Sequence, residues 1–113
     1  MNDRARESST NAVFQALADP TRRDVIRLLR KGAQRASDLA DATHASKPAM
    51  SRHLRVLRTA GLVEHDVGDD ERERLYTLAP APFAQLREWL EGVEAFWEVQ
   101  LASFKAHVEK RRK

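Results

Sequence analysis

Residues 45–63 read ASKPAMSRHLRVLRTAGLV and contain one complete helix with a start and a stop signal. Ser46 is a favourable N-cap, and Pro48 lies in the first turn, where a missing backbone N–H group does no harm. Gly61 is placed to end the helix. The stretch therefore predicts a capped helix over residues 46–59.

The two sides of this helix differ in chemistry. Met50, Leu54 and Leu57 recur at the i, i+4, i+7 spacing of a stripe that faces a core. At about 100° per residue, Arg52 and Arg55 lie roughly opposite that stripe. The helix carries four cationic side chains, including these two arginines, and no acidic one. Such a helix fits the major groove of B-DNA, which is about 12 Å wide. The alternative is an ordinary solvated face on a core helix.

Length and composition indicate one domain. The chain has 113 residues, of which 42% are hydrophobic, enough for a core, and 33% are charged. The formal net charge is only +3, yet cations concentrate at residues 44–60 and 110–113. A local positive patch on a nearly neutral chain favours an oriented nucleic-acid surface over general polyanion binding.

Several classes of site are excluded by what the sequence lacks. It has no cysteine, which removes disulfides, thiolate metal sites and cysteine nucleophiles. The histidines are scattered without metal-ligand spacing, so neither a metal nor a cofactor is expected. No nucleophile–base pair and no glycine-rich phosphate loop is present, so no enzymatic activity is predicted. No stretch resembles a signal peptide or a membrane span, and we expect a cytoplasmic protein.

Two shorter helices are predicted before the basic one. Asp19 followed by Pro20 is a strong start signal for a helix over residues 20–31. Its inward apolar positions are Val25, Leu28 and Leu29. A helix at about residues 36–43 buries Leu39 and Ala40 but has no clear cap, because Arg35 occupies the N-cap position. Two short helices joined by about three residues, the second one basic, are typical of a helix-turn-helix.

A hairpin is predicted directly after the basic helix, which makes a winged helix-turn-helix. Residues 62–67 and 74–78 are interpreted as its strands, with turn residues between them. The tip, formed by Asp69, Asp70 and Glu71, is acidic and would repel phosphate. Either Arg72 and Arg74 reach DNA past this tip, or the wing stays off the DNA.

A long apolar seam marks the C-terminal helix, whose start lies at Pro80 and Pro82. The seam extends over about 23 residues, or roughly 35 Å. Its members are Leu86, Leu90, Val93, Trp97, Leu101, Phe104 and Val108, and it is widened by Trp89 and Phe96. A small core cannot cover all of it. We expect it to pack on a second copy together with Phe14 and Leu17 of a first helix that begins at Thr10 or Asn11. The alternative is that it folds back on its own domain.

The chain resembles the ArsR-type family of small bacterial winged-helix repressors over about residues 10–108. The matching text is FQALADPTRR at 14–23, DLA at 38–40, the stretch 46–63 and YTL at 76–78. The resemblance implies a mainly α fold with a small β-hairpin, in the order α-α-α-α-β-β-α. It also implies a homodimer held by the first and last helices. Such a repressor leaves its double-stranded DNA operator when an effector binds, and the effector is not evident from the sequence.

On this basis the domain is expected at residues 10–109, between a disordered arm at 1–9 and a basic tail at 110–113. Family DNA contacts carry over to the basic helix and the wing, at Ser46, Lys47, Pro48, Ser51, Arg52, His53, Arg55, Arg72 and Arg74. For His53, a phosphate contact and a hydrogen bond within the motif both remain open.

The chain departs from the metal-sensing members of that family. It lacks their paired cysteines, and His107 is the only plausible zinc ligand near its end, so a member that does not sense metals is predicted. A rival function remains, in which the winged helix docks a protein partner through its C-terminal helix without specific DNA binding.

Overall fold

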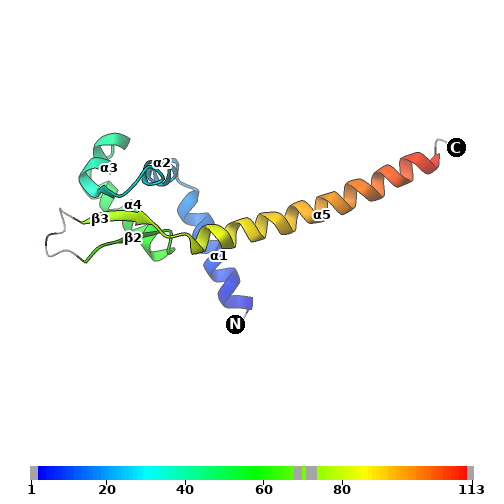
Figure 1. The fold of residues 1–113 in the computed structure, drawn as a ribbon, viewed down its shortest axis with the longest axis horizontal. Coiled ribbons are helices and arrows are strands. Elements are labelled where there is room, and N and C mark those ends of the chain that lie inside the picture. The colour runs from blue at the N-terminus through cyan, green and yellow to red at the C-terminus, as the bar shows by residue number, and fades with distance from the viewer. Residues whose placement is uncertain (1–2, 68–69, 71–73, 112–113) are drawn as a thin grey trace. The chain divides into compact units, whose positions relative to one another are not determined.

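The computed structural model describes residues 3–67, 70 and 74–111 (Figure 1). In chain order the elements are α1 (Asp3–Leu17), α2 (Pro20–Leu29), β1 (Gln34–Arg35), α3 (Ala36–Thr43), α4 (Lys47–Thr59), β2 (Val63–His65), β3 (Leu75–Leu78) and α5 (Ala81–Arg111). The chain divides into two compact units, Met1–Phe83 and Ala84–Lys113, and each is described by itself. The predicted order of four helices, a hairpin and a final helix is confirmed.

The core of the first unit is built from the apolar sides of α1 to α4 and from β2. Its fully buried large side chains are Val13, Val25, Leu39, Met50, Leu54, Leu57 and Leu62. The predicted stripe of α4 is thus confirmed. On α2, Ile26 is buried beside Val25 and Leu29, while Leu28, expected to face inward, is only half-buried. Positions 25, 26 and 29 lie on one side of a helix at 100° per residue, and α2 packs against α1, α3, α4 and β3.

A three-stranded antiparallel sheet, in the order β1-β3-β2, forms the base of the wing. Val63 pairs with Leu78 and His65 with Tyr76 on one side, and Gln34 pairs with Tyr76 on the other. Strand β1 was not predicted, because two residues carry no alternation. The strands of the hairpin are also shorter than the predicted ranges 62–67 and 74–78.

The first helix is longer than predicted. Residues 3–9, expected to belong to a disordered arm, are the exposed first turns of α1. Their polarity suggested disorder, but they contain no Gly or Pro and include the good helix formers Arg4, Ala5, Arg6 and Glu7. The hydroxyl of Thr10 donates to the carbonyl of Arg6 at 2.9 Å inside the helix, where a helix start had been expected.

The second helix is shorter than the predicted range 20–31. Backbone N–H groups of Lys31 and Gly32 bond to carbonyls three residues back, which tightens and ends the turn. At the other end of the chain, α5 continues into the predicted basic tail as far as Arg111.

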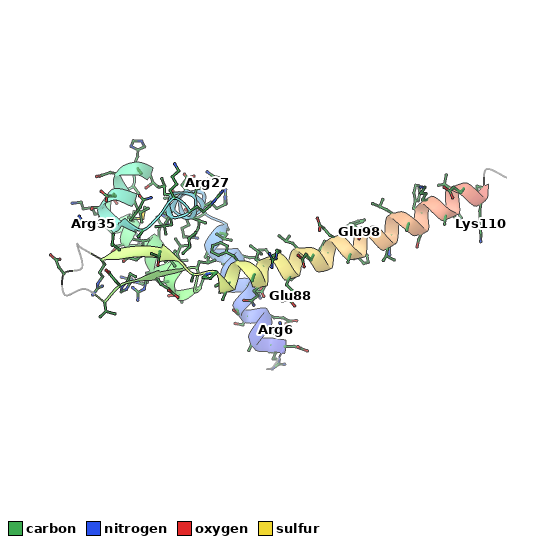
Figure 2. The ribbon with its side chains drawn as sticks, in the orientation of Figure 1. Arg6, Arg27, Arg35, Glu88, Glu98 and Lys110 are labelled. Carbon is green, nitrogen blue, oxygen red and sulfur yellow. The ribbon has the colours of Figure 1, made fainter. Side chains whose placement is uncertain are left out.

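No side chain of α5 is buried. Its exposed apolar residues are Trp89, Leu90, Val93, Phe96, Trp97, Val99, Leu101 and Phe104. All but Val99 belong to the seam predicted from the sequence. Polar side chains, among them Glu88, Glu98 and Lys110, stand out from the same helix (Figure 2).

Candidate nucleic-acid interface

Both ends of α4 are fixed by local hydrogen bonds. The hydroxyl of Ser46 accepts from the Ala49 N–H at 3.2 Å. At the other end, the N–H of Gly61 bonds to the carbonyl of Arg58 and the N–H of Leu62 bonds to the carbonyl of Leu57, each at 2.9 Å. With Gly61 at φ +79°, this is the Schellman arrangement that ends helices. The predicted start and stop of α4 are confirmed.

The side of α4 opposite its buried stripe is exposed and basic. Lys47, Ser51, Arg52, Arg55 and Arg58 are all exposed, whereas Met50, Leu54 and Leu57 are buried. Ser46 and Pro48 are exposed at its N-terminus. The structure therefore brings together, on one helix, six of the residues predicted to contact DNA: Ser46, Lys47, Pro48, Ser51, Arg52 and Arg55.

A tight turn joins α3 to α4. His44 adopts the left-handed conformation at φ 60° and caps α3, whose N-cap Arg35 makes no side-chain capping bond. The N–H of Ala45 bonds to the carbonyl of Ala40 at 3.1 Å. Helices α3 and α4 pack against each other. This is the helix-turn-helix geometry predicted from the two short helices and the turn.

His53 does not share the exposed side of α4. Its side chain is 20% exposed, and its Nδ1 lies 3.3 Å from Nη1 of Arg22 and 3.9 Å from Oδ2 of Asp19. The structure gives His53 a hydrogen-bonding partner on α2, outside the helix-turn-helix, and its phosphate contact stays a prediction. This partner could not be predicted from the sequence, because Arg22 precedes His53 by 31 residues.

Asp19 is the N-cap of α2. Its Oδ2 accepts from the backbone N–H of Arg22 at 3.0 Å, and Pro20 follows in the first helical position, as predicted. The hydrogen bond from that N–H holds the pKa of Asp19 below its ordinary value, and the positive charge of Arg22 acts in the same direction. Partial burial opposes the shift.

We expect Asp19→Ala to reduce the free energy of unfolding by about 1 kcal/mol near neutral pH, because the first turn of α2 loses its cap. Since the pKa of Asp19 is lowered in the folded protein, this stabilisation is complete above the unfolded value of about 3.9 and disappears as pH falls through the folded value. Denaturant unfolding at several pH values measures the difference.

Asp24→Ala is the matched control for this loss of one carboxylate from α2. Asp24 forms an exposed ion pair with Arg27 at 2.6 Å, and such pairs within a helix contribute only about 0.2–0.5 kcal/mol. Equal losses for the two variants, or an Asp19→Ala loss that stays the same as pH falls through the acid range, would contradict the capping role.

Comparison with known proteins places this geometry in a family. A family model described as "Bacterial regulatory protein, arsR family" matches residues 19–65. The HTH-type transcriptional regulator Rv2034 of Mycobacterium tuberculosis is 38% identical over 97 residues, which are 85% of each chain. The chain belongs to the ArsR family. It is therefore a DNA-binding transcriptional regulator, as the sequence predicted.

Other transcriptional regulators are similar to this chain over different lengths. The transcriptional repressor SdpR of Bacillus subtilis is 43% identical over 47% of this chain and 59% of its own. The ArsR-like regulator of Rhodococcus sp. RHA1 has 32% identity and a TM-score of 0.79, covering 97% of this chain and 98% of that one. A homodimeric winged helix-turn-helix domain from Mycobacterium bovis has 28% identity and a TM-score of 0.65, covering 84% and 88%. These likenesses favour the DNA-binding function over the rival docking module.

The wing of this ArsR-family chain is closed at its base by Asp66. Its N–H donates to the carbonyl of Leu75 at 3.2 Å, and its Oδ1 accepts from the Leu75 N–H at 2.9 Å. Arg74 is half-buried, and its Nε is buried without a hydrogen-bond partner in the described part of the chain. Of the other predicted wing residues, Asp70 is exposed, whereas Asp69, Glu71 and Arg72 lie outside the described residues.

The described residues of this ArsR-family regulator contain neither a metal-binding cluster nor a membrane-spanning helix. Within residues 3–67, 70 and 74–111, no three His, Asp or Glu side chains are grouped so that they could hold a metal ion. No helix in that part of the chain is long and apolar enough to cross a membrane.

Proposed function

We propose that this ArsR-family regulator is a homodimeric repressor that binds an inverted-repeat operator through α4 of each copy. The observation that carries the proposal is the cationic exposed side of α4, opposite a fully buried stripe. Chromosomal DNA places such a regulator in the cytoplasm. We expect neither a cofactor nor a membrane to be involved.

The side chains of α4 divide into base-reading and backbone-contacting groups. Arg52, exposed one turn into the helix, is suited to a bidentate contact with guanine. Ser46, Lys47 and Ser51, with the N-terminus of the helix, are suited to phosphates and set the register. Arg55 and Arg58 add phosphate contacts farther along α4. Pro48 fixes the first turn, and Arg74, with Arg72, would supply any wing contact.

The second copy is expected to cover the seam of α5. Aromatic side chains exposed along a helix are typical of an interface that is incomplete in a single chain. Trp89, Phe96 and Trp97 are each more than half exposed, and Phe14 on α1 is 37% exposed, while Leu17 is half-buried. The described homodimer of the Mycobacterium bovis relative supports the same assembly for this chain.

Selection of DNA from a random-sequence pool tests this function directly. A two-fold dimer places two copies of α4 in successive major grooves, so the selected sites should be inverted repeats with half-site centres about 10 bp apart. Binding should weaken steeply with salt, because the cations of α4 displace condensed counterions. A pool with no enriched sequence, or with a single unrepeated half-site, would contradict the proposal.

The wing tip should modulate binding through its charge. We expect Asp70→Asn to tighten binding to a selected duplex, with the largest gain at low salt, where phosphate repulsion is least screened. The comparison with wild type is made by titration at two salt concentrations. If affinity is the same for both proteins at low salt, the wing tip does not approach the DNA.

DNA release should not depend on thiol-binding or transition metals. The chain has no cysteine, and a zinc site needs three or four nitrogen, sulfur or oxygen ligands within about 2.3 Å. We therefore expect zinc or arsenite at modest excess to leave the affinity for a selected duplex unchanged. Stoichiometric zinc binding that lowers this affinity would refute the expectation and direct attention to His107.

A further inference from the structure

One side chain, Arg22, joins three helices at the corner where α1 meets α2. Its Nε donates to the carbonyl of Ala16 at 2.6 Å, and its Nη2 donates to the carbonyl of Gln15 at 3.1 Å, both at the end of α1. Its Nη1 lies 3.3 Å from Nδ1 of His53 on α4. The guanidinium on α2 thus reaches from α1 to the recognition helix.

The contact between Arg22 and His53 requires one protonation state of the imidazole. A guanidinium only donates hydrogen bonds, so Nδ1 of His53 must accept. As a hydrogen bond, this contact implies a neutral imidazole with its proton on Nε2. A protonated imidazole donates from both nitrogens, and it would turn this hydrogen bond into a repulsive contact between two cations.

We propose that Arg22 and His53 form a protonation-sensitive clamp that positions α4. Neutral His53 holds the recognition helix to Arg22 at the α1–α2 corner, whereas protonation breaks that contact, moves His53 toward Asp19 and, by shifting α4, weakens DNA binding. The clamp deepens the proposed function, since its effect is read through operator binding. His53 is a positioning residue in this scheme, because it acts through the orientation of α4.

Asp19 provides the alternative partner for a protonated His53. Its Oδ2 lies 3.9 Å from Nδ1 of His53, within ion-pair range. The backbone N–H of Arg22 lowers the pKa of Asp19, so the carboxylate stays ionised where histidines gain their proton. The same oxygen caps α2, so a shift toward His53 would also disturb the start of that helix.

The other ionisable groups near α4 do not interact directly with the imidazole of His53. In the described part of the chain they make no hydrogen bond or ion pair with His53. On the packed elements they are Arg23, Asp24 and Arg27 of α2, Asp38 and Asp41 of α3, Glu64 and His65 of β2, and Lys47, Arg52, Arg55 and Arg58 of α4 itself. The charged residues of α1 lie at its far end, at positions 3–7.

The direction in which DNA affinity changes with pH distinguishes the clamp from simple electrostatic attraction. Protonation of histidines adds positive charge, which by itself strengthens attraction to the DNA phosphates. The clamp predicts the opposite result, a weaker complex at lower pH. Measured coupling between two sites in proteins is commonly about fivefold or more.

The first test needs no DNA. Nitrogen NMR of the histidine rings in the full chain, above about pH 7.5, distinguishes a proton on Nε2 from a proton on Nδ1. The expected result for His53 is an unprotonated Nδ1. A proton on Nδ1 in the neutral ring would overturn the clamp.

The second test compares His53→Asn with the matched control His44→Asn, on a duplex selected by the wild-type protein. An asparagine carbonyl lies close to the position of Nδ1 and stays neutral, and His44 is an exposed left-handed residue, a conformation that Asn tolerates. Between about pH 7.5 and 6.0 we expect wild type and His44→Asn to lose about fivefold or more in affinity. The His53→Asn variant should lose none.

Two results of the second test would overturn the clamp: wild-type affinity that is constant or rises on acidification, and a fall that persists in His53→Asn. Circular dichroism melting of each variant shows whether it is folded at both pH values. If no duplex is selected at all, the proposed DNA function fails, and that outcome is distinct from a selected duplex whose binding does not respond to pH.

Discussion

Trp97→Glu is expected to convert the protein from a dimer into a monomer and to abolish tight operator binding. The indole lies on the seam of α5 and is 57% exposed in the single chain. In a dimer it would be covered, so a glutamate there would bury an unpaired carboxylate, at several kcal/mol per copy. Sedimentation velocity at micromolar concentration measures the assembly, and titration of a selected duplex measures the binding.

Val99→Glu is the matched control on the same helix. Val99 is 63% exposed, like Leu101 at 64%, but it lies two residues from Trp97 and hence about 200° around the helix. The Val99→Glu variant should remain dimeric, whereas the Leu101→Glu variant should become monomeric like Trp97→Glu. Equal effects of Val99→Glu and Leu101→Glu, or a wild-type chain that sediments as a monomer, would show that the seam is not the dimer interface and would leave room for a helix that folds back.

Arg52→Ala is expected to weaken binding to a selected duplex by about 1–3 kcal/mol and to relax the preference at one base pair in each half-site. The reason is geometric, because the guanidinium projects from the exposed side near the start of α4. Titration against the selected duplex and single-base variants of it gives both quantities.

Arg58→Ala serves as the comparison, since it removes the same charge from the last turn of α4. It should weaken all sequences about equally and lower the salt slope by about one unit per subunit. If Arg52→Ala binds as tightly as wild type, or weakens every sequence alike, base readout belongs to another residue.

Helix α4 could be predicted almost completely from its own sequence. Ser46, Pro48 and Gly61 act on backbone groups within a few residues, and the apolar stripe has a clear helical period. The same holds for the start of α2 at Asp19 and Pro20. The exposed basic side of α4 follows from the same periodicity, so the predicted contacts on that helix needed no tertiary information.

The remaining features depend on contacts between distant parts of the chain. The two residues of β1 become a strand only because β3 lies beside them. Gln34 pairs with Tyr76, which lies 42 residues later in the sequence. The orientation of His53 depends on Arg22 in another helix. Helix α1 starts early because the helix propensity of residues 3–9 is high although these residues are polar. Hydrophobic periodicity does not detect this propensity, because the residues are not apolar.

Because the wing is closed at its base by hydrogen bonds, its length can vary independently of the rest of the fold. Asp66 and Leu75 are joined by two hydrogen bonds, and β3 is paired on both sides, so the residues between 66 and 75 can change in number without moving α4. Each doubling of a flexible loop adds only about 0.6 kcal/mol of closure entropy. Insertions at this tip are thus a route by which related regulators could acquire different DNA preferences, and by which new ones could be engineered, on an unchanged helix-turn-helix.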